Sequence, residues 1–94
     1  MNDIVHTIKS YYITEHARFE MKRRGIKESE VDRVLSSPGQ VEEVRDGRLV
    51  YQSKMRMGTP HGKYLLRVFV DIDREPAAIV TAYRTSKIHK YWKN

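Results

Sequence analysis

The sequence predicts an α+β fold in which two or three N-terminal helices pack on one face of a four-stranded antiparallel meander sheet. Apolar residues recur at helical spacing up to about residue 36, and from residue 41 they alternate with a period of two. Helical segments followed by strand segments are typical of α+β domains, whose helices cover one side of the sheet. The chain has 94 residues and no linker rich in Pro, Gly or Ser, so we expect a single domain over 1–94.

Three segments predict the helices. The first, 3–12, has apolar residues four and seven or eight positions apart, which is the spacing of a short amphipathic helix. The second, 15–24, follows Thr14, a favourable N-cap, and precedes Gly25, which suits a left-handed residue after a helix end. The third, 28–36, carries apolar residues on one face and is stopped by Ser-Pro-Gly.

Alternating or continuous apolar patterns predict four strands, over 41–45, 48–57, 63–73 and 77–84. Asp46-Gly47 separates the first two and indicates a hairpin with a type I′ turn. The third strand is apolar on both faces, as expected at the centre of a sheet, except that Arg67 interrupts one of them. A basic segment completes the chain.

Composition narrows the function classes. Eighteen Lys and Arg against twelve Asp and Glu give a net charge of +6, which favours polyanionic partners. The chain has no cysteine, which excludes disulfides and thiolate metal sites. Its four histidines share no ligand spacing, so we predict neither a metal nor a cofactor. No apolar run reaches the roughly 20 residues of a membrane span and no signal-peptide pattern opens the chain, so we expect a cytoplasmic protein without membrane contact.

His16 is the first candidate for chemistry. On a helix over 15–24 it shares a face with Glu20 and Arg23, because residues three and four apart lie on one side. A carboxylate one turn away would orient the imidazole and raise its pKa. The alternative is a histidine at the border of the core that bonds a backbone carbonyl. Both interpretations stay open.

Arg67 is the second candidate. An arginine between apolar residues on a central strand is costly unless its guanidinium meets a carboxylate, water or a ligand phosphate. One interpretation is therefore a phosphate-binding residue. The other is a structural ion pair with Glu20, Glu42 or Glu43.

Aromatic and basic residues interleave over 81–92. Aromatic rings stack on unpaired bases and cations neutralise phosphates, so this mixture suits single-stranded RNA. A tail that docks its apolar side chains on the sheet is the alternative, and both can hold together. The candidate RNA-binding residues are Arg23, Arg24, Lys87, His89, Lys90 and Tyr91. His, Arg, Lys and Tyr side chains also suffice for metal-free RNA cleavage by internal attack of the 2′-hydroxyl.

Five motifs carry a family resemblance: TxHA at 14–17, MxxRGI at 21–26, LRV at 66–68, DxD at 71–73 and TAYRTSKI at 81–88. They resemble the bacterial family labelled domain of unknown function 4258 over nearly the whole chain. The layout of helices followed by a meander looks like that of the RelE-type ribonuclease toxins and the wider barnase–colicin-like nuclease fold.

The resemblance to RelE-type toxins implies a catalytic set. His16 would be the general base or acid, Arg67 and Arg84 would bind and stabilise the scissile phosphate, and Tyr83 or Tyr91 would position a base or assist proton transfer. The implied protein is the RNA-directed toxin of a toxin–antitoxin system, a metal-independent endoribonuclease that acts with or without the ribosome and is held in check by an acidic antitoxin-like protein. The alternative is a non-catalytic basic module that binds nucleic acid or another protein.

Overall fold

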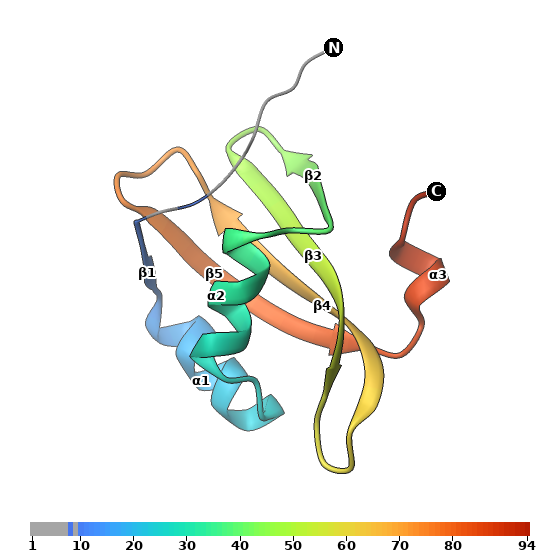
Figure 1. Cartoon of the computed structure of the whole chain (residues 1–94). Helices are drawn as coiled ribbons and strands as arrows, with labels where there is room; N and C mark the ends of the chain where they lie inside the picture. Colours follow the sequence, from blue (N-terminus) through green and yellow to red (C-terminus); the bar gives the residue numbers. More distant parts are fainter. Residues whose placement is uncertain (1–7, 9) are drawn as a thin grey trace.

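Five strands form one mixed sheet, two helices lie against one side of it, and a short third helix follows the last strand (Figure 1). The computed structural model describes residue 8 and residues 10–94. The elements are β1 (Tyr11–Ile13), α1 (Glu15–Arg24), α2 (Glu28–Ser36), β2 (Gln40–Arg45), β3 (Arg48–Met57), β4 (Gly62–Asp71), β5 (Ala77–Thr85) and α3 (Ile88–Tyr91). The sheet order is β1-β5-β4-β3-β2. No helix in this part of the chain is long and apolar enough to cross a membrane.

The predicted four-stranded antiparallel meander is wrong, because β1 adds a fifth strand that runs parallel to β5 and pairs Tyr11 with Ala77 and Ile13 with Ile79. The helix predicted over 3–12 is therefore wrong at its C-terminal end, and its residues 3–7 and 9 lie outside the described part. Side-chain burial in β1 alternates with a period of two. A run this short fits both a helix and a strand, and only its long-range partner decides between them.

The two helices predicted over 15–24 and 28–36 are confirmed. Thr14 Oγ1 accepts the N–H of Ala17 at 3.1 Å and caps α1. Gly25 has φ 68°, the left-handed conformation that glycine adopts without a steric penalty, and it ends this helix. In α2 the backbone N–H of Lys27 donates to Glu30 at 2.8 Å. The local capping signals thus place both helices correctly.

The hairpin of β2 and β3 is confirmed, but its type I′ turn is wrong. A type I′ turn needs positive φ at both central residues, whereas Gly47 has φ 83° and no non-glycine residue of the described chain has a positive φ. A register shift between Glu43 and Arg45 accompanies the turn. Such a bulge adds the twist that a turn with one left-handed residue does not supply. The strands predicted over 63–73 and 77–84 correspond to β4 and β5.

The two faces of the sheet differ in what covers them. Ala17 of α1 and Val34 of α2 pack in one apolar cluster with Tyr51, Leu66 and Val68 of the sheet. Side chains alternate between faces along a strand, so Arg67, which stands between two of these core residues, points to the opposite side. The polar residues of the sheet that contact Arg67 therefore lie on the face away from α1 and α2. We call this the open face.

Candidate functional site

A hydrogen-bonded row of four side chains crosses the open face. The strand register sets Gln40 beside Gln52, Gln52 beside Arg67, and Arg67 beside Tyr83. Gln52 Nε2 donates to Gln40 Oε1 at 2.8 Å, Arg67 Nε donates to Gln52 Oε1 at 2.8 Å, and a terminal nitrogen of Arg67 donates to the Tyr83 hydroxyl at 2.7 Å. Directly opposed residues of neighbouring strands are close enough for such contacts. The row fixes the direction in which the guanidinium points.

Arg67 is only 9 % exposed, yet none of the ion pairs among the described residues includes it. The predicted structural ion pair is therefore wrong: Glu20 and Glu42 pair with other cations, and Glu43 is exposed. The Tyr91 ring lies 4.2 Å from the guanidinium carbon and the Phe69 ring 5.4 Å from it, which offsets part of the cost of burial. A nearly buried cation without a carboxylate favours an anion as ligand.

The C-terminal segment is bound to the same face by the row. Gln52 Nε2 donates to the Tyr91 carbonyl at 3.2 Å, and the Lys93 N–H donates to Gln40 Oε1 at 3.1 Å. Lys54 Nζ lies 4.3 Å from the centroid of the Trp92 ring. Tyr91 and Trp92 are consequently half-buried on the sheet. These contacts hold the Tyr91 ring over Arg67.

Tyr83 and Tyr91 form the second half of the cluster. Their rings meet edge to face, with centroids 6.5 Å apart. The pKa of Tyr91 is lowered, first because Tyr83 hydrogen-bonds its hydroxyl, and further because the Lys90 and Arg67 cations favour the phenolate, while desolvation opposes the shift. Arg67 thus donates to Tyr83, and Tyr83 interacts with a phenol that ionises more readily than usual. The cluster combines a cation that has no described carboxylate partner with a candidate proton acceptor.

The sheet separates Arg84 from Arg67. Arg84 follows Tyr83 and therefore points to the helix-covered side, where Nη1 donates to the Arg24 carbonyl at 2.9 Å. Its guanidinium carbon also lies 5.2 Å from the Tyr64 ring. A cation on the last carbonyls of a helix stabilises the negative end of the helix dipole. The described contacts of Arg84 thus hold the end of α1.

His16 is exposed on α1, and none of the hydrogen bonds of the described structure joins it to a backbone carbonyl, so the interpretation as a histidine at the border of the core that makes such a bond is wrong. α1, which carries His16, packs on the helix-covered side of the sheet, and the charge of His16 contributes to the lowered pKa of Glu20. Of the four predicted catalytic residues, Arg67 is hydrogen-bonded to Tyr83, and Tyr83 and Arg84 line one cleft.

A cleft of about 490 Å³ lies where α1 ends beside β5, and it is lined by Arg23, Arg24, Tyr83 and Arg84. Glu20 forms ion pairs with Arg23 and Arg24 of α1, at 2.8 Å with Arg24. The hydrogen bond from Arg23 is the main reason why the pKa of Glu20 is lowered. Two of the predicted RNA-binding residues thus lie in this cleft. Lys87, His89 and Lys90 are exposed at α3, and Tyr91 lies on Arg67.

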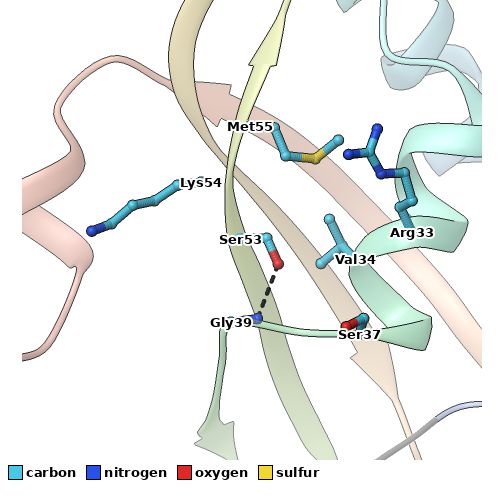
Figure 2. A pocket seen from close by; sticks show the side chains of 7 residues that line it. All are labelled: Arg33, Val34, Ser37, Gly39, Ser53, Lys54 and Met55. Carbon is cyan, nitrogen blue, oxygen red and sulfur yellow. Dashed lines mark hydrogen bonds between the residues drawn. The ribbon is translucent and has the colours of Figure 1, made fainter.

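A second cavity of about 340 Å³ lies between α2 and β3 (Figure 2). Its lining residues are Arg33, Val34, Ser37, Gly39, Ser53, Lys54 and Met55. The Ser53 hydroxyl is occupied, because it accepts the Gly39 N–H at 3.0 Å. The Lys54 side chain points away from the other six, toward α3 (Figure 2). Arg33 is then the one cation that faces the cavity among these residues, so the open face is the stronger candidate site.

Gln40 and Gln52 are functional candidates that the sequence did not reveal. Gln52 is fully buried, although its position in an alternating strand predicts a wet side chain. The bulge in the hairpin sets it beside Gln40, and an undistorted turn would shift that pairing. The one signal in the sequence for this role is a glutamine on the strand that precedes the strand of Arg67. It identifies Gln52 only when the register that pairs Gln52 with Arg67 is known.

Comparisons with known proteins bear on family membership. Neither curated proteins nor solved structures gave a match. A family model described as domain of unknown function (DUF4258) matches residues 13–84, which include α1 through most of β5 and hence Gln52, Arg67 and Tyr83. The match ends before α3, so Tyr91 lies outside it. Because this match covers well over half of the sequence, the chain belongs to the DUF4258 family.

Proposed function

We propose that the chain is an RNA-directed, metal-independent endoribonuclease whose reaction centre is the cluster of Arg67, Tyr83 and Tyr91. One observation carries the proposal: a nearly buried guanidinium without a carboxylate lies against a tyrosine whose pKa is lowered. An uncompensated cation suits a phosphate. A tyrosine whose pKa is lowered suits general base catalysis better than an ordinary one, because a larger fraction of it is phenolate at a given pH.

The proposed step is internal transesterification. The Tyr91 phenolate removes the proton of the ribose 2′-hydroxyl, and the 2′-oxygen attacks the neighbouring phosphorus. The bond from phosphorus to the 5′-oxygen breaks, and the Lys90 ammonium supplies the proton that this oxygen needs. Arg67 stabilises the negative charge that develops on the phosphoryl oxygens. The products are a 2′,3′-cyclic phosphate and a 5′-hydroxyl end, so protons and charges balance.

Proton transfer is assigned to Tyr91 rather than to His16 on geometric grounds. Lys90 Nζ lies 5.4 Å from the Tyr91 ring centroid, so a cation stands on the solvent side of the cluster. His16 is carried by a helix on the far side of the sheet. Aromatic rings beside cations also suit RNA with unpaired bases, because stacking needs an accessible base face.

A toxin of this kind requires restraint in the cell. We propose an acidic antitoxin-like protein that covers the basic residues around Tyr91, and ribosome-bound RNA as a target of the free toxin. The charge of +6 favours an acidic partner. Expression of the chain alone and together with the product of a neighbouring gene tests this part of the proposal.

The test of the activity uses purified wild type with Arg67→Gln and Tyr91→Phe, incubated with a uridine-rich RNA in the presence of EDTA, with and without ribosomes. We expect cleavage products with cyclic phosphate ends from the wild type, and rates at least about a hundredfold lower from both variants. His16→Ala is the matched control and should retain the wild-type rate.

Two results contradict the proposal. The first is the absence of RNA cleavage in every condition together with normal growth on expression. The second is loss of activity in His16→Ala without loss in Tyr91→Phe. Salt-sensitive RNA binding without cleavage would support the alternative, a non-catalytic binding module.

A further inference from the structure

The cleft lined by Arg23, Arg24, Tyr83 and Arg84 lies at the free edge of β5. β1 pairs only with the first three residues of β5, so the later half of that strand has no described strand neighbour on this side. Tyr83 points to the open face and Arg84 to the helix-covered side, and a cleft lined by both therefore lies between the two faces. Tyr83 belongs to this cleft and to the Arg67 cluster, so it joins them.

The cleft carries excess positive charge. Its three guanidinium groups meet one described carboxylate, that of Glu20. Arg24 is occupied by structure, because Nη1 donates to the Ala82 carbonyl at 2.9 Å and Nη2 pairs with Glu20. Arg23 and Arg84 each use a single terminal nitrogen in their described bonds. Their remaining N–H groups are donors of the kind that binds phosphate.

We infer that this edge cleft binds a second phosphate of the same nucleic-acid strand whose neighbouring phosphate lies against Arg67. The substrate class is then a single-stranded oligonucleotide that passes over the edge of β5 at Tyr83, and not a mononucleotide. This inference rests on the proposed function, since it extends the RNA site at Arg67.

The positions of the two cationic groups favour a single strand over a duplex. The two cationic groups lie on either side of the edge of one strand, and only a flexible chain follows such a bend. A duplex is stiff and pairs its bases with one another. Tyr83 and Tyr91 at the crossing point suit unpaired bases, which stack on aromatic rings.

Arg23 and Arg18 give a matched pair for the test. Both belong to α1, their side chains are 56 % and 60 % exposed, and each pairs with a glutamate. Arg23 lines the cleft, whereas Arg18 does not. The probe is a fluorescent uridine octamer with 2′-O-methyl groups, in which the blocked 2′-oxygen prevents cleavage. Binding is measured by anisotropy across a salt series.

We expect Arg23→Gln to weaken octamer binding about fivefold and to reduce the log–log salt slope by about 0.7, the value for one phosphate contact on a single strand. Arg18→Gln should change neither quantity. The wild type should bind the octamer at least about tenfold more tightly than a dinucleotide with one phosphate, and more tightly than a duplex of the same length. In Arg23→Gln the ratio of the affinity for the octamer to the affinity for the dinucleotide should be smaller than in the wild type.

The inference is overturned if both variants weaken binding equally, if the duplex binds as tightly as the single strand, if length has no effect, or if the octamer does not bind. Because the probe cannot be cleaved, these results are independent of catalysis. If only Arg23→Gln loses octamer affinity and the wild type cleaves no RNA, the ribonuclease proposal is refuted and the edge cleft is still supported as a phosphate site. If the wild type cleaves RNA but Arg23→Gln and Arg18→Gln bind the octamer equally well, the ribonuclease proposal is supported and the edge cleft is refuted.

Discussion

Gln52 accepts a hydrogen bond from Arg67 Nε at 2.8 Å across β3 and β4, and this bond orients a nearly buried guanidinium that no described carboxylate neutralises. Gln52 is itself bonded to Gln40 and to the Tyr91 carbonyl. One amide therefore positions both the cation and the segment that carries the tyrosine above it.

Gln52→Glu should weaken anion binding without loss of the fold. The new carboxylate keeps the shape of the amide but neutralises Arg67, so we expect RNA affinity to fall about tenfold or more. Gln52→Met removes the hydrogen bonds without adding charge and should bind RNA more tightly than Gln52→Glu. Anisotropy with the blocked octamer and thermal unfolding measure the two effects. Equal affinities of wild type and Gln52→Glu would contradict the role of the Arg67 charge.

Tyr83→Phe should shift the pH dependence of catalysis. The pKa of Tyr91 lies below the ordinary tyrosine value of 10.0, chiefly because of the hydrogen bond from Tyr83. The phenolate is the active form of a base, so kcat/KM should rise with pH and level off above this pKa. Without the Tyr83 hydroxyl the pKa of Tyr91 rises, so the rising part of the pH profile of kcat/KM should move to higher pH.

The control for this shift is Tyr12→Phe, which changes an exposed tyrosine of β1. Spectrophotometric titration of tyrosinate gives a readout that does not depend on activity. Tyr91→Phe should remove a group that ionises below 10.0. An unchanged pH profile of kcat/KM in Tyr83→Phe would show that the Tyr91 phenolate is not the base.

Asp71→Asn should make the free energy of unfolding less dependent on pH in the acid range. Arg48 holds Asp71 through two bonds, at 2.6 and 3.1 Å, and is the main reason why the pKa of this carboxyl lies below its ordinary value of 3.8. A lowered folded-state pKa stabilises the protein above the unfolded value, and this contribution disappears as the pH falls through the folded value. Denaturant unfolding between pH 2 and 7 should therefore show a steeper loss below about pH 4 in the wild type than in Asp71→Asn.

Tyr51→Phe should leave the protein as stable or make it more stable. Tyr51 is fully buried, its hydroxyl has no hydrogen-bond partner in the described structure, and burial raises its pKa to about 12. An unsatisfied buried polar group costs about 1–3 kcal/mol, and phenylalanine removes it without leaving a large cavity. Thermal unfolding measures the change. A loss of more than about 1 kcal/mol would reveal a partner for this hydroxyl.

Gly39→Ala should displace the C-terminal segment. A Cβ at this position would lie 2.8 Å from Cη2 of Trp92, which is too close for two carbon atoms. Trp92 is the single tryptophan of the chain, so its fluorescence reports the movement directly. We expect emission at longer wavelength and RNA cleavage reduced at least about tenfold, because Tyr91 loses its place over Arg67.

The control is Ser37→Ala in the same loop, which should keep the wild-type spectrum. Ser37 is exposed, and none of the hydrogen bonds of the described structure uses its hydroxyl. Identical spectra of Gly39→Ala and wild type would mean that the segment does not depend on contact with this glycine.

Elements with strong local signals were predictable. The capping residue Thr14 and the left-handed Gly25 bounded α1 correctly, and the alternating or continuous apolar patterns located β2 to β5. β1 was not predictable, because three residues carry too little periodicity and its partner lies more than sixty residues away in the chain. The same limit applies to the turn at Gly47, whose bulge depends on the twist of the finished sheet.

By itself the sequence determined the excess of positive charge, the family and the anomaly of Arg67 on a central strand. Only the tertiary structure decided which candidates meet. Side chains alternate between the two faces of the sheet, so neighbouring residues such as Tyr83 and Arg84 point to opposite sides of it. Register and helix placement, which arise from long-range packing, put Gln52, Tyr83 and Tyr91 around Arg67 and left His16 on the other side.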